Sequence, residues 1–385
     1  MIYLLIAIFI LFGVVHFDIL NNNIGRKGYW ILTFIILVLL LGFRYRVGGD
    51  SLSYEDAYPG MPDFRDIKLY GFYYTERLFA YQPFWIILVA FAKLIGKDYY
   101  IFQFLHAILV NIVLSYFLFK NSKTPFSVLL FLFITHYYFY LTIEVEREIL
   151  AICVFLLNLK NLEEKKWLKY YCLAFISFMF HMSAIFIFIL PIFRVITFTK
   201  KTIVTIILLL TPLIFFKNFF IEILKPILFL ESMESKFKGY QEIEFSITGT
   251  IAYYTVRVIC FIPILFYGIN KNYKSNWMLN AYIIVSVLSL ALVGFERFLN
   301  YLIIPYIILF IDILYSLNIQ FRNIFFRYIF VFLVFCNIFF SIPWRLFTTS
   351  MTGDKYYYLF FPYVSVFDKH IIKEREKYMV NQWDL

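Results

Sequence analysis

A compact group of charged residues follows the second apolar stretch of the chain, and its composition suits the binding of a phosphate group. Arg44 and Arg46 stand two residues apart, and Gly48, Gly49 and Asp50 follow directly. Arginine offers a planar fork of N–H donors that matches phosphate oxygens, and glycine lets the backbone bend and approach a ligand closely. Asp50 can act as a base or orient an arginine. A basic membrane anchor is the simpler alternative, but it does not explain the polar residues Asp50, Tyr54, Glu55 and Asp56.

Two other groups of polar residues stand at the borders of apolar stretches. Glu146 and Arg147 open an apolar helix, where an acid suits the positive end of the helix dipole and a cation does not. An arginine in this place favours an anionic partner or ligand. His181 and Ser183 separate two apolar stretches, and an ionisable residue at membrane depth indicates function, although a hydrogen-bonded packing residue is the alternative. With a pKa near ~6.5, a histidine can transfer protons at neutral pH.

The remaining candidates are Glu296, Arg297 and Tyr301, which begin another apolar stretch, and Glu76, which stands beside Arg77. An ion pair that caps a helix is the simpler explanation for Glu296 and Arg297. The sequence contains neither a glycine-rich phosphate loop nor a dinucleotide fingerprint, and it lacks the HExxH and GxSxG motifs. ATP-driven transport and conventional hydrolase chemistry therefore lose support.

The composition indicates a membrane protein. Hydrophobic residues make up 62% of the 385 residues and charged residues 16%, whereas soluble domains average roughly half and roughly a quarter. Apolar stretches of the length that crosses a bilayer recur along the chain. The net charge of +10 comes from basic residues in short loops, which is typical of membrane orientation rather than of nucleic-acid binding. The four cysteines stand singly and predict neither a disulfide nor a metal site.

This pattern predicts an all-α, polytopic transmembrane bundle of about twelve spans. It forms one domain, residues 1–345, followed by an aromatic and charged tail of residues 346–385. The first apolar stretch lacks the features of a cleavable signal and is predicted to be a span. The spans are expected at residues 1–20, 29–43, 100–119, 126–141, 147–160, 168–181, 183–199, 202–217, 250–268, 277–295, 299–317 and 326–343.

Residues 82–95 are short for a span, and the distribution of basic residues decides how they lie. If they lie along the membrane surface as an amphipathic helix, every strongly basic loop falls on one side, which the positive-inside rule assigns to the cytoplasm. Both termini and the loop 44–99 then lie outside, together with all of the candidate site residues. An interfacial aromatic belt explains the aromatic run of residues 356–364, with stacking on sugar rings as the alternative.

Four of the polar clusters resemble, in order, the motifs of the EpsG family of membrane proteins. Each motif alone is weakly specific, whereas four motifs in order and at the right spacing are much more so. Glu148 and Gly49 depart from the family pattern, in which Gln and Thr are common. The matching segments, which lie within roughly residues 1–365, are Phe43–Tyr54, Glu146–Ala151, Phe180–Ala184 and Glu296–Tyr301.

The resemblance implies a polysaccharide polymerase of the Wzy type, with a fold similar to that of the GT-C glycosyltransferases, in which a surface helix follows the first outer loop. Such proteins join lipid-linked oligosaccharide repeat units into capsule, O-antigen or exopolysaccharide at the external face of the bacterial cytoplasmic (inner) membrane. The implied substrates are a donor and an acceptor carried on polyprenyl pyrophosphate. The lipid bilayer and a chain-length regulator are further expected partners, and neither nucleic acid nor a cofactor is expected.

For this reaction Asp50 is the first candidate for the base and His181 the second, while Arg147 is expected to stabilise developing phosphate charge. The acids Asp50, Glu55 and Asp56 could hold a metal, but their spacing does not require one. A flippase for the same lipid-linked glycan is an alternative that the nearly charge-free middles of the spans disfavour, and an O-antigen ligase or acyltransferase is another. The residues expected to bind substrate or pyrophosphate are Arg44, Arg46, Tyr54, Glu76, Glu146, Ser183, Glu296, Arg297 and Tyr301.

The basic-residue distribution generates a testable topology. A cysteine introduced at Ser53 should react with a membrane-impermeant thiol reagent in intact cells, because residues 44–81 are expected outside. A cysteine at Asn161 should react only after the cells are opened, because residues 160–169 are expected in the cytoplasm. The parent chain, with its own four cysteines, provides the background. Labelling at position 161 but not at position 53 in intact cells would overturn the topology.

Overall fold

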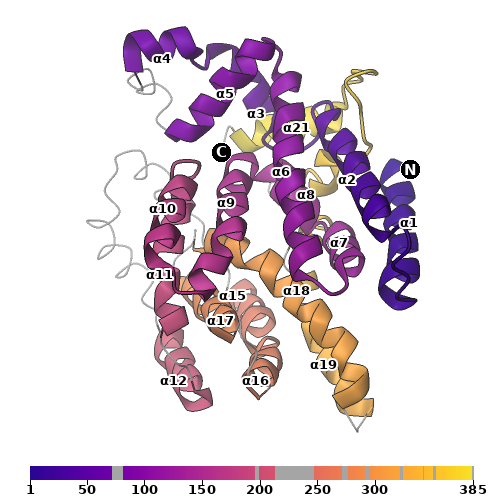
Figure 1. Ribbon diagram of the computed structural model, residues 1–385, viewed down its shortest axis with the longest axis vertical. Coiled ribbons are helices and arrows are strands. Elements are labelled where there is room, and N and C mark those ends of the chain that lie inside the picture. Colours follow the sequence, from indigo (N-terminus) through magenta and orange to yellow (C-terminus); the bar gives the residue numbers. More distant parts are fainter. Residues whose placement is uncertain are drawn as a thin grey trace.

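The computed structural model describes residues 1–71, 81–195, 199–212, 247–270, 276–291, 295–320, 324–340, 342–349 and 353–383. Within these ranges the fold is all-helical, as predicted, and β pairing is limited to two isolated bridges, Arg44 with Ser365 and Thr349 with Lys355. In Figure 1 helices α1 and α2 form one side of the molecule, α9, α10 and α11 the other, and α6 lies between them. Both termini lie toward the same end of the molecule.

The first half of the chain supplies several long helices and a cap of short ones. Helix α1 continues without a break into a π-helical turn, Val14–Ile19. Helix α2 packs along α6, and α9 packs against α6 and α10. The helices are α1 (Ile2–Gly13), α2 (Arg26–Gly42), α3 (Ser51–Ala57), α4 (Phe64–Tyr70), α5 (Pro83–Ile95), α6 (Tyr99–Asn121), α7 (Pro125–Ile134), α8 (Tyr137–Phe139), α9 (Glu146–Glu163), α10 (Trp167–Phe178), α11 (Ile185–Val195) and α12 (Lys200–Leu210).

The second half forms a smaller group of helices, in which α17 contacts α11 and α12 of the first half. Helix α18 packs against α7, α9 and α17. Helix α15 runs into a π-helical turn, Thr255–Ile259, before α16 begins. The helices are α15 (Ile247–Tyr254), α16 (Ile262–Asn270), α17 (Asn276–Ala291), α18 (Glu296–Gln320), α19 (Ile324–Phe339), α20 (Ile342–Arg345) and α21 (Lys373–Trp383).

Four helical segments of the described chain are long and apolar enough to cross a membrane: Ile2–Ile19, Tyr99–Asn121, Gly249–Tyr267 and Glu296–Tyr315. Helices also lie at the other predicted spans, although four of these spans include residues outside the described ranges, namely 196–198, 213–217, 292–294 and 341. The predicted span 126–141 is sharply bent in the structure. It is two helical pieces, Pro125–Ile134 and Tyr137–Glu144, which meet at 84°. The number of about twelve crossings and the GT-C-like outer loop stay predictions.

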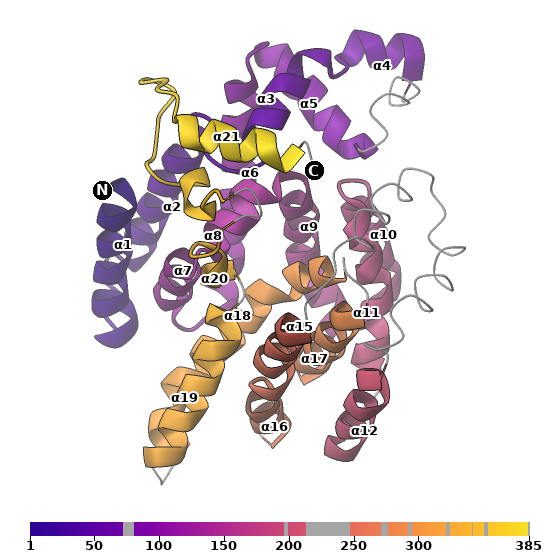
Figure 2. The ribbon, with the colours of Figure 1, turned by 180° about the vertical axis from the view of Figure 1, so that it is seen from behind.

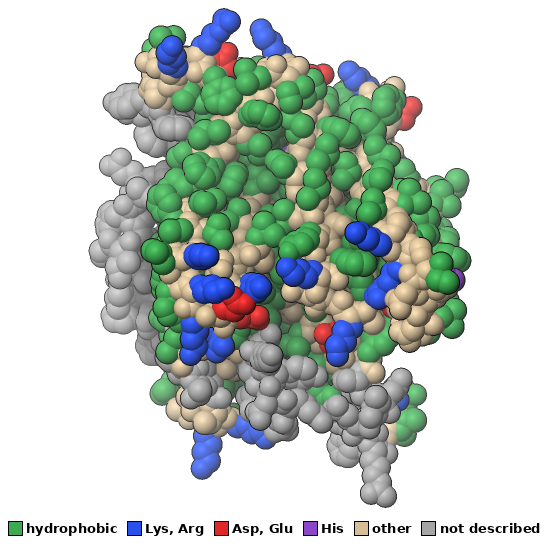
Figure 3. Space-filling view, in the orientation of Figure 1, with side chains coloured by type: hydrophobic (Ala, Val, Ile, Leu, Met, Phe, Trp, Pro, Cys, Tyr) green, Lys and Arg blue, Asp and Glu red, His purple; other side chains and the backbone are tan. Residues whose placement is uncertain are grey.

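The surface of the molecule fits a membrane environment. Figure 3 shows Lys and Arg side chains in one band across the middle of the face, charged residues again at the top, and hydrophobic surface between the two levels. Large side chains that are exposed on α6 and α10 include Leu109, Ile112, Leu168 and Phe175. Such contiguous apolar surface is unusual on a soluble monomer and is expected where lipid covers it.

Helices α3, α4 and α5 cover one end of the bundle (Figure 1). Helix α5 occupies the place of the predicted surface helix 82–95. It begins at Pro83, which cannot donate a helical hydrogen bond and is tolerated in a first turn, and it ends before Gly96. Its Trp85 and Val89 are buried, and it packs on α6. Lys93 Nζ donates to the carbonyl oxygens of Pro59 and Met61, at 3.3 and 2.5 Å, so α5 also holds the segment that follows α3.

Buried hydrogen bonds tie α9 to α10. Ser177 Oγ donates to the carbonyl oxygen of Ala151 at 2.7 Å, and Asn158 Nδ2 donates to the carbonyl oxygen of Tyr170 at 2.8 Å. Bonds of this kind between membrane helices contribute about 1 kcal/mol each. They fix the register of α10 on α9, and thereby the place of residues 181–184 beside the start of α9.

Candidate functional site

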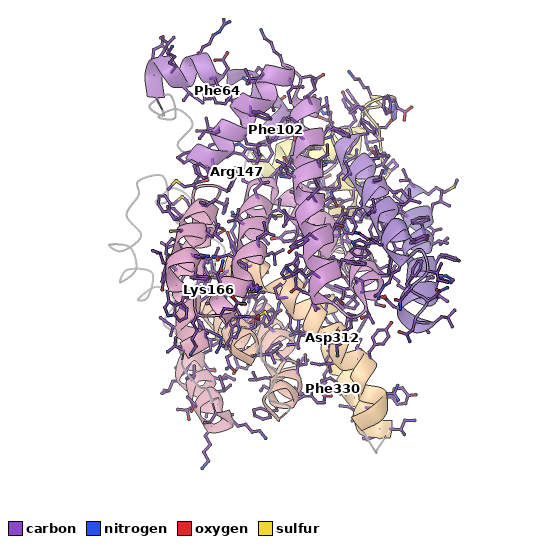
Figure 4. The ribbon with its side chains drawn as sticks, in the orientation of Figure 1. Phe64, Phe102, Arg147, Lys166, Asp312 and Phe330 are labelled. Atoms are coloured by element: carbon purple, nitrogen blue, oxygen red, sulfur yellow. The ribbon has the colours of Figure 1, made fainter. Side chains whose placement is uncertain are left out.

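The first turn of α9 organises the candidate site. Figure 4 shows Arg147 near one end of α9, with Lys166 toward the opposite end. Consecutive residues of an α-helix point about 100° apart, so Glu146, Arg147 and Glu148 face three different neighbours. Glu146 contacts the end of α2, Arg147 contacts α3, and Glu148 contacts the junction of α10 and α11.

Glu146 forms a buried ion pair with Arg44, and each of the two residues is 1% exposed. The guanidinium of Arg44 also donates to the carbonyl oxygens of Leu41, at 2.6 Å, and Val47, at 3.3 Å. On the other side, the Tyr99 hydroxyl lies 3.4 Å from both carboxylate oxygens of Glu146. Each charge is therefore paired and hydrogen-bonded, which a buried ion pair needs in order to be tolerated.

The two glycines after Arg44 pack closely against the segment that precedes α9. Gly48 has a φ of +106°, and a Cβ built there would lie 2.0 Å from a methyl carbon of Ile143. The backbone N–H of Gly49 donates to Glu144 Oε1 at 2.6 Å, and a Cβ at Gly49 would come within 2.9 Å of the same carboxylate. The glycines thus bring two motifs of the chain together, which is the close approach that their occurrence predicted, with protein in the place of a ligand.

Arg147 lies between two tyrosines. Its Nε donates to the Tyr54 hydroxyl at 3.0 Å, and its guanidinium carbon stands 4.7 Å from the centre of the Tyr81 ring. Burial raises the pKa of Tyr54, the charge of Arg147 lowers it, and the charge of Asp50 raises it, so the tyrosine stays neutral and accepts the bond. Burial likewise raises the pKa of Tyr81, the charge of Arg147 lowers it, and the charge of Asp50 raises it. Asp50 therefore lies in electrostatic reach of the same two aromatic residues that flank Arg147.

Glu148 belongs to a buried polar network that includes the histidine and serine predicted at residues 181–183. Ser183 Oγ lies 3.1 Å from Glu148 Oε1, 2.7 Å from His181 Nδ1 and 2.8 Å from the Tyr301 hydroxyl. Asn300 Nδ2 donates to Glu148 Oε1 at 3.3 Å. Glu148, which departs from the family pattern, is thus the acceptor on which the network converges.

The hydrogen bonds indicate which nitrogen of His181 accepts. The backbone N–H of Ser183 donates to His181 Nδ1 at 3.2 Å, so Nδ1 carries a lone pair and the proton of a neutral ring lies on Nε2. The single proton of Ser183 Oγ then goes to Nδ1 or to Glu148, and the Tyr301 hydroxyl donates to Ser183. His181 is thereby oriented by Ser183 as the N-cap of a short helical turn, Met182–Ala184.

The fourth cluster, Glu296 to Tyr301, lies at the start of α18, and its Tyr301 joins this network through Ser183. Glu296 pairs with Arg257 at 3.9 Å, and Arg257 donates to the Tyr282 hydroxyl at 2.7 Å. The exposed Arg297 acts electrostatically on Glu148 and Tyr301. Glu76 and Arg77 lie outside the described residues.

Arg46 has partners of a different kind from those of Arg147. Its Nη2 donates to Glu376 Oε2 at 2.8 Å, its Nε lies 2.7 Å from Glu376 Oε1, and Glu55 stands 3.7 Å away. Arg44 and Arg46 thus both contact carboxylates of the protein itself. A direct role for them in binding pyrophosphate stays a prediction, whereas their geometry indicates that they shape the loop.

The structure adds residues that were not among the predicted site residues. Glu144 and Glu148 belong to the acidic cluster around Arg147, and Asn300 lies beside Tyr301, so their proximity to the predicted residues was a usable signal. Tyr81, Tyr99 and Glu376 lie far from every motif, and no local pattern distinguishes them. In the described part of the chain, no three His, Cys, Asp or Glu side chains lie close enough together to hold a metal ion.

The Arg44–Glu146 pair generates a prediction about stability. Replacing either residue alone, as Arg44→Met or Glu146→Leu, should lower the free energy of unfolding by about 3–5 kcal/mol, because it leaves the other charge buried without its partner. The double variant should lose clearly less than the sum of the two, since no unpaired charge remains. Thermal unfolding of the detergent-purified protein measures this. A double variant whose loss equals that sum would show that the pair is not coupled.

Comparison with known protein families gives a match over most of the chain. The model of the EpsG family matches residues 27–365, a range that contains Arg44, Arg147, His181 and Tyr301. Neither curated proteins nor solved structures provided a match. Because the family model covers most of the chain, and because the residues of its motifs meet around the start of one helix, this membrane protein belongs to the EpsG family.

Proposed function

We propose that the protein is a membrane glycosyltransferase of the Wzy type, which polymerises lipid-linked oligosaccharide repeat units at the external face of the cytoplasmic membrane. Membership of a family associated with polysaccharide synthesis supports the general activity. The main observation behind this proposal is the environment of Arg147. This cation stands at the start of a helix, and its side chain lies between Tyr54 and Tyr81 and near Asp50. A helix start binds anions, and an arginine there adds charge and a directional fork.

The proposed donor is a glycan on polyprenyl pyrophosphate, and the acceptor is a repeat unit on the same kind of lipid. A hydroxyl oxygen of the acceptor forms a bond to the anomeric carbon of the donor, while the bond from that carbon to the pyrophosphate oxygen breaks. The hydroxyl proton passes to a base, and the lipid pyrophosphate leaves with the electron pair of the broken bond. The donor is already activated, so no nucleotide is needed.

Arg147 is the proposed electrostatic partner of the leaving pyrophosphate. Charge that develops in the transition state is stabilised best by donors that are already in place. The bond from Arg147 Nε to Tyr54 and the contact with the Tyr81 ring hold this guanidinium before substrate arrives. Arg297, which is exposed and acts on the Glu148 network, is a second candidate for the pyrophosphate.

Asp50 is the proposed base. It precedes α3 and acts on the tyrosines that flank Arg147, so a hydroxyl that reaches Asp50 also comes near the proposed leaving group. His181 is the second candidate, because Nδ1 is engaged by Ser183 and the ring is oriented. Glu146, Ser183, Glu296 and Tyr301 are assigned to holding these residues in place rather than to substrate.

The Arg147→Lys variant tests the proposal. Lysine keeps the charge but loses the planar fork, so polymerisation should fall by roughly 100–1000-fold, which corresponds to the loss of one directed transition-state interaction, about 2.7–4 kcal/mol. The measurement is polymer yield and chain length from cells in which the variant replaces the parent chain.

Arg194→Lys is the matched control, because Arg194 donates to the carbonyl oxygen of Glu163 at the other end of α9 and lies outside the proposed site. It should leave polymer length unchanged. Expression and membrane insertion of both variants are compared with the parent chain. Polymer of near-normal length from the Arg147→Lys strain would reduce Arg147 to a structural residue.

Deletion of the whole chain separates polymerase from flippase. Single repeat units should accumulate on lipid at the external face, because each unit is made and moved across the membrane but is not joined to the next. Mass spectrometry of the lipid-linked glycans, combined with accessibility to an external glycosidase, measures this. Accumulation confined to the inner leaflet would instead indicate a flippase.

A further inference from the structure

The C-terminal segment forms part of the candidate site, although its sequence indicated only an aromatic belt. Backbone hydrogen bonds join it to the loop between α2 and α3: Tyr45 N–H donates to Val364 O at 2.8 Å, Gly48 N–H to Leu359 O at 2.9 Å, and Val366 N–H to Phe43 O at 2.9 Å. Two backbone N–H groups of the loop that carries Arg44 and Arg46, those of Tyr45 and Gly48, therefore donate to residues more than 300 positions away in sequence.

Helix α21 closes over this segment, beside α3 and near the ends of α2 and α6 (Figure 2). Its Arg375 is 1% exposed, and its guanidinium donates to three carbonyl oxygens, those of Tyr358 at 2.9 Å, Pro362 at 2.5 Å and Arg46 at 3.3 Å. Burial lowers the pKa of Arg375 to about 10, which leaves it charged at neutral pH. A charged fork thus links α21 to both the C-terminal segment and the loop.

The neighbouring residue continues the linkage through side chains. Glu376 holds Arg46 by the two contacts described above, Arg46 stands beside Glu55 on α3, and Glu55 accepts from the Tyr100 hydroxyl of α6 at 2.9 Å. Four elements are connected in this way: α21, the loop, α3 and α6. Asp50 and Tyr54 lie on the stretch of chain between Arg46 and Glu55, so the linkage brackets the proposed base and the tyrosine that holds Arg147.

We propose that Arg375 and Glu376 are positioning residues of the site, and that Glu376 sets the place of Asp50 and Tyr54 through Arg46. Arg46 then serves as an anchor of the loop and not as a ligand of pyrophosphate. The effect on polymerisation rests on the proposed function, whereas the effect on the loop does not. Helix α21 lies beyond the range of the family model, which ends at residue 365, so the proposal assigns a role to residues outside the family motifs.

The test measures opening of the loop independently of activity. Val47 is fully buried, and a cysteine in its place reacts with a thiol reagent only when the loop opens. In the full-length protein carrying Val47→Cys, adding Glu376→Gln should speed labelling at position 47 by roughly 10–100-fold, the effect expected when one charge-assisted hydrogen bond is lost. Mass spectrometry of the labelled peptide keeps the native cysteines from interfering.

Glu374→Gln is the matched control, because Glu374 is the exposed acid two residues earlier on the same helix. It should leave the labelling rate unchanged. Arg375→Lys provides a second variant, which keeps the charge but reaches fewer carbonyl oxygens, and it too should speed labelling. Equal rates for Glu376→Gln and Glu374→Gln would overturn the positioning role.

The exchange Arg46→Glu with Glu376→Arg tests the anchor itself, since an arginine at position 376 can still pair with acids at positions 46 and 55. Compared with either single variant, the double variant should again be labelled slowly at position 47 and should again make polymer. If the parent chain makes polymer and the double variant regains slow labelling but not polymer, Arg46 does more than anchor the loop. That result would overturn the assignment of Arg46 as an anchor only. A parent chain that makes no polymer would refute the proposed function, while the labelling rates would still decide the positioning role.

Discussion

The structure depends on the buried ion pair between Arg44 and Glu146. Moving two charges out of water costs several kcal/mol for each ion, so the pair persists only where both partners meet and their remaining hydrogen-bonding groups are satisfied. Here Leu41 and Val47 supply carbonyl oxygens to the arginine, and Tyr99 supplies a hydroxyl near the carboxylate. The pair joins the end of α2 to the start of α9, and the loop between α2 and α3 has little freedom once it forms.

The neighbouring contacts follow from this junction. With Glu146 directed at Arg44, helix geometry turns Arg147 toward Tyr54 and Glu148 toward Ser183. One side of the helix start thus carries a cation flanked by tyrosines, and another carries a network of neutral hydroxyls and a buried carboxylate. The two groups differ in what they can do: the cation can attract an anion, while the network fixes the orientation of His181.

Close packing of the backbone completes the arrangement. The glycine at position 48 has a positive φ and leaves no space for a Cβ against Ile143, so the loop lies directly on the segment before α9. The C-terminal segment covers the loop from the other side and accepts hydrogen bonds from the N–H groups of Tyr45 and Gly48, which would cost free energy if buried without partners. The loop is therefore enclosed by residues from two distant parts of the chain, and its shape depends on both of them.

The sequence by itself determined the helical class, the membrane setting and the clusters of polar residues that meet at one helix start, because apolar runs and misplaced charges are local signals. It did not determine the partners. Whether Arg46 contacts a substrate or Glu376, 330 residues away, depends on which surfaces come together on folding. The bend within residues 125–144 likewise escaped a pattern that is mostly apolar. Hydrophobicity decides what is buried, but packing and hydrogen bonding across the whole fold decide what each buried group contacts.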